Sequence, residues 1–231
     1  MFDSVTVLGA TGRSGSAICA RLRERGVALR EHSAELIVLC VPDRAIAEVA
    51  RGIEPGPWIC HVSGATPLAA LEPHRLRFSV HPLQTLVAWR GPEQLDGAYG
   101  AVSAESPEAL ERGLWLARTL GLRPFQLPDG ERYLYHAAAM FASGYLVTLH
   151  RAASTLARLA GAPPEGLECL MRRTIDNGFE LTGPIARGDW GTVEAHLAGI
   201  RAHVPELEPL YRALAQATQL LPAEKPVETA R

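Results

Sequence analysis

Polar side chains on one long apolar segment have the types and spacing for acid–base chemistry. The segment from Arg132 to Leu159 contains no proline and is rich in alanine and leucine, so it is predicted to be one helix. His136, Ser143 and His150 follow one another at intervals of seven residues and share a stripe of that helix. Histidine has an ordinary pKa near neutral pH, which suits it to proton transfer. We expect His136 and Ser143 to be catalytic, and the alternative is that each is a hydrogen-bonded core residue.

The same segment is expected to be a central, buried helix. From Ala137 to Leu149 it carries no charged residue on any side. A helix that is apolar all round normally lies inside a protein. These 13 uncharged residues fall short of the ~20 that cross a bilayer, so we expect no membrane segment.

A second histidine, His81, follows a predicted strand. Apolar runs that end at Val41, Val62 and Val80 alternate with helical segments, which is typical of a parallel sheet. In such sheets ligands bind beyond the carboxyl ends of the strands. The residues that follow the three runs are therefore expected to line one crevice, and they include Pro42, Ser63, Gly64, His81 and Gln84.

A glycine-rich turn follows the first predicted strand, Val5 to Leu8. Glycines at such a turn let the backbone approach a pyrophosphate, and the free N–H groups at the start of the next helix favour the anion. Glycine turns also simply join strands to helices, and that alternative stays open. The pattern predicts that a dinucleotide contacts Gly9, Thr11, Gly12, Arg13, Ser14 and Gly15, with Val41, Pro42, Ser63 and Gly64 nearby.

The segment after the first helix is short for a dinucleotide domain. Only a few residues separate the short run Val27–Leu29 from the strand that begins at Leu36, so the usual intervening helix has no room. An acidic residue for the adenosine ribose, or an arginine for a 2′-phosphate, is expected in this segment. Arg30, together with Arg13, favours NADP over NAD. The shortness of the segment argues against a bound cofactor.

Composition excludes several classes of function. A formal net charge of -2 provides no basic field for nucleic acid. The eight histidines show no spacing typical of metal ligands, so we assign no metal. The only lysine, Lys225, lies in the Pro/Glu-rich segment 222–231, which is predicted to be disordered. Scattered cysteines and no basic leader before the first strand indicate a cytoplasmic protein.

Strand patterns end before Gly130, and only helical patterns follow. We therefore predict an α/β architecture in two domains, with a Rossmann-like parallel sheet over residues 1–130. An all-α domain for substrate binding and dimerisation is predicted over residues 131–221. The tail is residues 222–231.

Five motifs together resemble those of bacterial two-domain proteins with a Rossmann-like N-terminal domain and a C-terminal helical domain of unknown function, family 2520. They are Val41-Pro42-Asp43-x-x-Ile46, His61-x-Ser63-Gly64, His81-Pro82-Leu-Gln84-Thr85, Tyr135-His136-Ala-Ala and Leu181-Thr-Gly-Pro-x-x-Arg187-Gly-Asp189. The family is similar to 3-hydroxyisobutyrate dehydrogenase, ketopantoate reductase, pyrroline-5-carboxylate reductase and prephenate dehydrogenase. The resemblance implies a nicotinamide cofactor, a helical domain like that of 6-phosphogluconate dehydrogenase, and a homodimer.

The expected activity is NAD(P)-dependent oxidoreduction of a small-molecule carbonyl, imine or hydroxy acid. His136, with His81, is expected to donate the proton. Gln84, Thr182 and Arg187 are expected to bind the substrate, with Arg187 pairing with a carboxylate. Short-chain reductases share the glycine turn but need a Tyr-x-x-x-Lys pair that this chain lacks. The non-enzyme alternative is a nucleotide-binding or scaffolding protein that has lost turnover.

Overall fold

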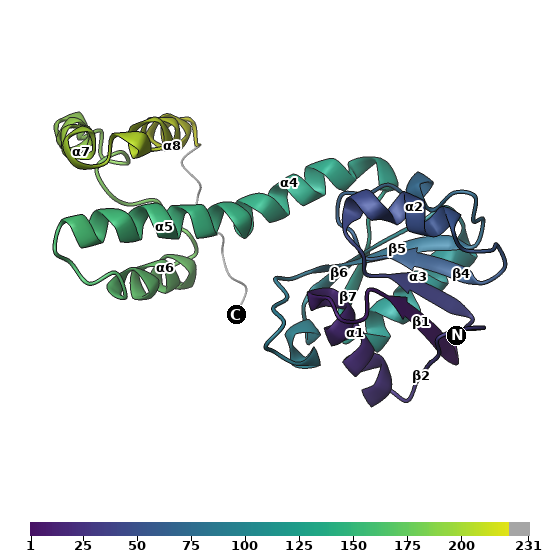
Figure 1. Cartoon of the computed structure of the whole chain (residues 1–231). Coiled ribbons are helices and arrows are strands. Elements are labelled where there is room, and N and C mark those ends of the chain that lie inside the picture. The colour runs from purple at the N-terminus through teal and green to yellow at the C-terminus, as the bar shows by residue number, and fades with distance from the viewer. Residues whose placement is uncertain (222–231) are drawn as a thin grey trace. The chain divides into compact units, whose positions relative to one another are not determined.

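The computed structural model describes residues 1–221 (Figure 1). Residue contacts divide the chain into two compact units, Met1–Ser143 and Gly144–Arg231. We had expected a division near Gly130. The first unit extends further because helix α4 (Arg132–Ala142) begins with a buried arginine that bonds to the sheet. The predicted tail, residues 222–231, lies outside the described residues.

The described part of the first unit is built on a seven-stranded sheet in the order β2-β1-β3-β4-β5-β6-β7. All neighbouring strands are parallel except β5 and β6, which are antiparallel. This arrangement confirms the Rossmann-like α/β prediction. The strands are β1 (Ser4–Leu8), β2 (Ala28–Leu29), β3 (Leu36–Leu39), β4 (Trp58–His61), β5 (Arg77–Leu83), β6 (Tyr99–Ala104) and β7 (Arg123–Gln126).

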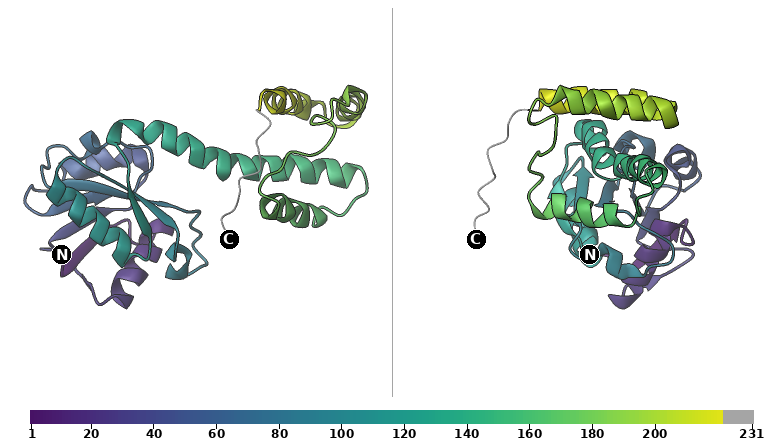
Figure 2. Two further views of the ribbon diagram at one scale, coloured as in Figure 1. Left: turned by 180° about the vertical axis from the view of Figure 1, so that it is seen from behind. Right: turned by 90° about the vertical axis from the view of Figure 1, so that its left-hand side faces the viewer.

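Helices cover both faces of this sheet, as Figure 2 shows from two further sides. Helices α1 (Arg13–Glu24) and α3 (Pro107–Thr119) pack on one face, where Val38, Phe78 and Val80 are fully buried. Helix α2 (Ile46–Arg51) and the 3-10 turn Leu68–Leu71 pack on the other face, against Leu39 and Ile59. Because successive side chains of a strand point to opposite faces, the apolar runs of the sequence fill both cores.

The second unit is helical throughout its described part, which confirms the all-α prediction. Asp189 caps helix α7 as its sequence position suggests, because its Oδ1 accepts a hydrogen bond of 3.1 Å from the Thr192 N–H. A 3-10 turn, Pro205–Leu207, leads into the last helix. The helices are α5 (Gly144–Leu159), α6 (Gly166–Asp176), α7 (Trp190–His203) and α8 (Glu208–Leu220).

The predicted central buried helix is wrong in two respects. The segment forms two helices, α4 and α5, separated at Ser143 with φ -128° and ψ -70°. Its apolar side chains are also exposed in the single chain, with Leu134 at 72% and Val147 at 51%. A helix that is apolar on all sides tends to be buried, but its sequence does not specify whether its own chain or a second chain covers it. Within residues 1–221 no helix is long and apolar enough to cross a membrane.

Candidate functional site

The glycine turn joins β1 to α1 beside the place where the sheet order reverses. Strand β1 pairs with β2 on one side and β3 on the other. Gly9 has φ +85°, and a Cβ there would overlap the Cys40 carbonyl at the end of β3. A Cβ at Gly15 would overlap the Gly9 carbonyl. Both positions therefore need glycine so that turn, strand and helix can approach one another closely.

The start of helix α1 is open to an anion. Gly12 is the N-cap, and within residues 1–221 no side chain caps this helix and no acidic residue lies in its first turn. Thr11, Gly12 and Arg13 are exposed, and Ser14 is half-buried. The first backbone N–H groups of a helix have no partner inside the helix and carry a partial positive charge. The turn therefore has the donor set that suits a pyrophosphate.

Arg30 lies directly after the two-residue strand β2. Its backbone N–H donates to the Val5 carbonyl at 3.0 Å, and its own carbonyl accepts from the Thr6 hydroxyl at 2.8 Å. These bonds fix Arg30 next to β1, with an exposed side chain. In the described chain no helix intervenes between β2 and β3, which confirms the shortened connection.

The two histidines expected to be catalytic lie next to each other. The ring centroids of His81, on β5, and His136, on α4, are 6.3 Å apart. Gly64 lies between them, because an added Cβ would be 2.8 Å from His136 Cδ2 and 2.9 Å from His81 Nε2. His81 is inside β5 and not after it, since β5 continues to Leu83 along the antiparallel β6. It still lies beyond the end of β4, whose last residue, His61, pairs with Ser79.

Tyr135, the residue before His136, is a partner that the sequence reasoning missed as a functional group. Its hydroxyl lies 2.8 Å from His81 Nδ1, and the two rings meet edge to face with centroids 5.5 Å apart. Burial raises the pKa of Tyr135 to about 12, and the nearby Arg132 guanidinium opposes this shift. The only available signal was its place in the Tyr135-His136 motif.

Arg132 fixes the start of α4 to the sheet. It is 1% exposed, although it carries a positive charge. Its Nε donates to Asp129 Oδ1 at 2.5 Å, its Nη1 donates to the Ser63 carbonyl at 3.1 Å, and its Nη2 donates to the Ser79 hydroxyl. These bonds join α4 to the residue two positions beyond the carboxyl end of β4 and to Ser79 within β5. They therefore position Tyr135 and His136, one turn further along the helix.

Burial keeps His81 and His61 neutral. The pKa of His81 is lowered to about 4, mainly by burial and further by His136 and Arg132, while Asp43 opposes the shift. The pKa of His61 is lowered to about 3 by burial, with further contributions from Arg132 and His81. His61 Nδ1 accepts from the Ser63 N–H at 3.2 Å, so its proton is on Nε2. That buried nitrogen has no hydrogen-bond partner within residues 1–221.

The structure supports the other predicted site residues of the first unit less directly than the two histidines. The Ser63 hydroxyl is already used in a local turn, where it accepts from the Thr66 N–H at 3.0 Å. Gln84 is exposed, and its Oε1 accepts from the Thr85 N–H at 2.9 Å. Ser143 follows the last residue of α4, about 10 Å along the helix from His136 at the usual rise per residue. Val41 and Pro42 follow β3, at the same sheet edge as the glycine turn.

Thr182 and Arg187 lie in the second unit, between α6 and α7, and both are exposed. Their predicted contacts with substrate stay predictions. The loop leads into the N-cap of α7 at Asp189.

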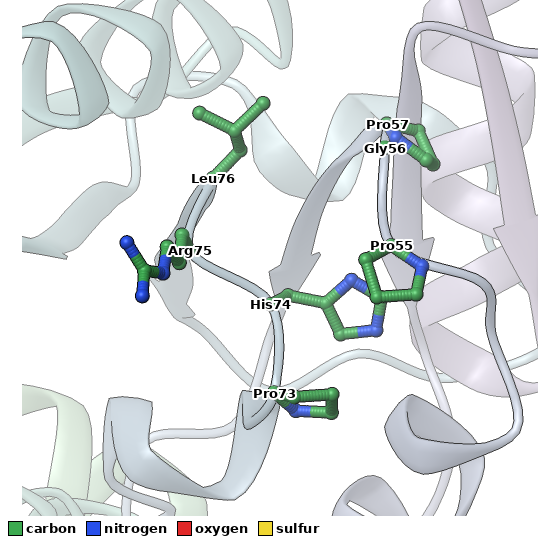
Figure 3. Close-up of a pocket in the computed structure, with 7 residues that line it drawn as sticks. All are labelled: Pro55, Gly56, Pro57, Pro73, His74, Arg75 and Leu76. Carbon is green, nitrogen blue, oxygen red and sulfur yellow. The ribbon is translucent and has the colours of Figure 1, made fainter.

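A shallow pocket of about 240 Å³ lies at the opposite edge of the sheet (Figure 3). Its walls come from residues 55–57 and 73–76, which precede β4 and β5. In Figure 3 the His74 ring faces Pro55, and the Arg75 side chain points away from that ring. Its polar groups do not converge, so we place the candidate site at the carboxyl edge.

A known protein family matches residues 98–218, more than half of the chain, and is described as Domain of unknown function (DUF2520). The matched region begins before β6 and runs into α8, so it includes Tyr135 and His136. The chain belongs to this family. Membership confirms the resemblance carried by the sequence motifs. Curated proteins gave no match to the chain.

Solved structures share the fold of this family member over nearly its whole length. A Bacteroides fragilis protein described as a candidate NADP oxidoreductase is 21% identical with a TM-score of 0.78, covering 94% of this chain and 97% of that one. Protein TM1727 from Thermotoga maritima is 24% identical with a TM-score of 0.73, covering 93% and 96%. A 1-pyrroline-5-carboxylate reductase from Streptococcus pyogenes is 15% identical with a TM-score of 0.60, covering 95% and 99%. At these identities the likeness shows a common fold.

Proposed function

We propose that this protein is an NAD(P)-dependent oxidoreductase acting on a small carbonyl, imine or hydroxy acid. The observation that carries the proposal is the joint presence of an open helix N-terminus and a pair of histidines at the carboxyl edge of one sheet. That edge is where open α/β sheets bind ligands. One solved structure of similar fold is described as a candidate NADP oxidoreductase, and another as a semialdehyde dehydrogenase NAD-binding protein in complex with NAD, which supports the same class.

The residues of the first unit fit a dinucleotide. Its pyrophosphate would lie on the turn from Gly9 to Gly15, against the N–H groups of α1. Arg13 and Arg30 would face a 2′-phosphate, which favours NADP over NAD. When bound in reduced form, the nicotinamide supplies a hydride. His136 and His81 would transfer the proton, and Ser143 and Gln84 are proposed to contact the substrate.

Nucleotide titration tests this proposal directly. Fluorescence of the four tryptophans should be quenched by NADPH at lower concentration than by NADH. The variant Arg30→Glu should weaken NADPH at least about tenfold, which corresponds to ~1.4 kcal/mol, and leave NADH nearly unchanged. Arg118→Glu, an exposed arginine near the end of α3, is the matched control. No response to either nucleotide at millimolar concentration would move the conclusion to the non-enzyme alternative.

A variant of His136 separates a catalytic role from a structural one. His136→Ala should retain the melting temperature and the nucleotide affinity of the wild type. Turnover should fall by the ~10² to 10⁴ expected for loss of a general acid. A large loss of stability would instead identify His136 as a structural residue.

We propose that a second copy of the chain covers the second unit, whose described part, residues 144–221, has only a small core of its own. Within residues 144–221 the buried hydrophobic side chains are confined to α7 and its end: Val193, Leu197, Ile200 and Val204. So few buried groups do not offset the conformational entropy lost on ordering a unit of this size. The stretch from Ala137 to Leu149 carries no charge. In a two-fold dimer the same surface of each copy packs against the other, and an uncharged surface can do so without charge repulsion.

Sedimentation tests the homodimer. The wild type should sediment as a dimer at micromolar concentration, and Val147→Asp should produce monomer. Leu76→Asp is the control, because Leu76 has similar exposure (41% against 51% for Val147) but lies at the amino edge of the sheet. A monomeric wild type would contradict the dimer.

We also infer a cytoplasmic location from the thiols. Cys19, Cys40 and Cys60 are buried, Cys169 is exposed, and all four are free. Free thiols are typical of reducing compartments. Thiol labelling of unfolded protein isolated without reductant should find four reactive groups, and a disulfide would contradict this location.

A further inference from the structure

Tyr135 holds His81 in one orientation. The phenol oxygen lies 2.8 Å from His81 Nδ1, and the rings are nearly perpendicular at 86°. On its other side, the Tyr135 ring packs edge to face against Phe125 of β7, with centroids 6.0 Å apart. Arg132 fixes the first turn of the same helix to the sheet. The hydroxyl is therefore placed by a rigid helix and a packed ring.

The direction of this hydrogen bond follows from the available partners. A phenol can donate or accept, and so can a neutral imidazole at either nitrogen. Within residues 1–221 the Tyr135 hydroxyl has no hydrogen-bond partner apart from His81. If His81 donated, the phenol proton would lack a protein acceptor. A hydroxyl that donates to Nδ1 satisfies both groups within the protein, and this direction leaves the proton of neutral His81 on Nε2.

His81 Nε2 is the nitrogen available to a ligand. It makes no hydrogen bond with any described residue, and His81 is only partly buried. It lies beside the Gly64 backbone and His136. This is the pattern of an acid–base group in which one nitrogen is oriented by a third residue and the other faces the reacting atom.

We propose that Tyr135 is a positioning and proton-relay residue that presents His81 as a neutral Nε2–H donor, a group that suits a carbonyl oxygen and not an imine nitrogen. This inference rests on the proposed oxidoreductase function. It assigns Tyr135 a role that acts through His81.

The proton balance of this step is complete. In carbonyl reduction the carbon would gain the hydride that a bound NAD(P)H supplies, and the oxygen, which gains the electron pair of the broken π bond, takes the Nε2 proton of His81. Nδ1 then takes the proton of Tyr135. A solvent proton adds to Nε2 and the phenolate takes the Nδ1 proton back, so each turnover consumes one solvent proton and restores the starting Nε2–H tautomer. Alcohol oxidation reverses each transfer.

The pKa values of His81 and Tyr135 determine which substrate group this pair can protonate. An alkoxide is basic enough to accept a proton from a neutral imidazole, which is a known electrophile toward carbonyls. An imine nitrogen must be protonated before hydride arrives, and this requires a stronger acid. Burial, His136 and Arg132 hold the pKa of His81 at about 4 against Asp43, and the pKa of Tyr135 is about 12. At neutral pH the pair can therefore offer only weakly acidic protons.

Nitrogen NMR of the histidine rings tests the relay without cofactor or substrate. At pH 7 the wild type should show His81 as the neutral Nε2–H tautomer with Nδ1 accepting a hydrogen bond. In Tyr135→Phe the Nδ1 resonance should move to that of a free acceptor. Tyr133→Phe removes a phenol hydroxyl from the same helix at a 70% exposed position and should leave the spectrum unchanged.

The spectrum of the wild type tests the proposed His81 tautomer even if Tyr135→Phe folds poorly. An Nδ1–H tautomer or an imidazolium in the wild type would overturn the proposal. An unchanged Nδ1 resonance in folded Tyr135→Phe would do the same.

Nucleotide binding and turnover separate this proposal from the oxidoreductase function. Tyr135→Phe should bind NADPH as the wild type does, whereas failure of the wild type to bind would defeat the oxidoreductase function and leave the NMR result intact. With a panel of aldehydes, 2-oxo acids and cyclic imines, we expect carbonyl reduction that Tyr135→Phe slows about tenfold or more. Turnover confined to imines, or no carbonyl reduced by NADPH-bound protein, would overturn the substrate class.

Discussion

The two units of the chain differ in how they satisfy their apolar residues. The first unit fills a core on each face of its sheet, with side chains such as Phe78 and Leu39 fully buried. The described part of the second unit buries few hydrophobic residues and exposes others, including Leu170 at 63% and Phe179 at 69%. A periodic apolar pattern therefore predicts helices in both units. Only in the first unit do the apolar side chains of these helices fill a completed core.

The units also differ in the polar groups they bury. The first unit buries Arg132, His61 and Ser79 near one sheet edge, although charged and polar burial is costly. Within residues 144–221 of the second unit, the buried polar side chain is that of Ser154. The first unit thus concentrates its costly burial at the candidate site.

The largest expected effect comes from separating the units. A fragment of residues 1–143 should unfold cooperatively, because its two cores are complete without the second unit. A fragment of residues 144–231 should lack a cooperative transition at micromolar concentration, as followed by circular dichroism. Cooperative unfolding of a monomeric second fragment would break the comparison.

Substitution of the buried arginine should have the next largest effect. Arg132→Met leaves Asp129 without its charge partner and removes the bonds to Ser63 and Ser79, so unfolding free energy should fall by about 3–5 kcal/mol. Arg201→Met removes an exposed pair with Glu208 in the second unit and should leave the unfolding free energy nearly unchanged. Urea denaturation of both variants measures the difference. Equal costs would show that Arg132 does not anchor α4.

A pH effect of intermediate size should come from His81. Its pKa in the folded protein, about 4, lies below its ordinary value, so the unfolded chain binds more protons as pH falls below ~6.5. Stability from this group is present above that pH and is lost as pH falls toward 4. Between pH 7 and 5 the wild type should lose about 1–2 kcal/mol more stability than His81→Gln. Identical slopes in urea denaturation would contradict a neutral His81.

The smallest expected effect concerns a helix cap in the second unit. Asp189→Ala removes the hydrogen bonds to Thr192 and should lower the stability of the second unit slightly. Ser106→Ala removes the matching cap of α3 in the first unit and should cost a similar amount. Hydrogen exchange should assign each loss to its own unit. An Asp189 effect that spreads to the sheet would show that the units unfold together.

The sequence by itself determined the elements and the edge at which the site lies. Alternating apolar strands and helices imply a parallel sheet, and the carboxyl ends of parallel strands lie together. Gly9, Gly15 and Gly64 could therefore be assigned to one sheet edge from their positions after strands, whereas His81, predicted to follow a strand, lies within β5. The absence of a helix between β2 and β3 could also be predicted, because too few residues separate the two strands.

Only the tertiary structure decided which groups touch and which apolar faces are covered. His81 and Tyr135 are 54 positions apart, and Arg132 reaches a carbonyl 69 positions away, so no local spacing predicts either bond. The exposed face of α4 and α5 was misjudged for a related reason. Periodicity records the residues that a helix must bury, whereas burial depends on surfaces brought together by folding and, as we propose, by a second chain.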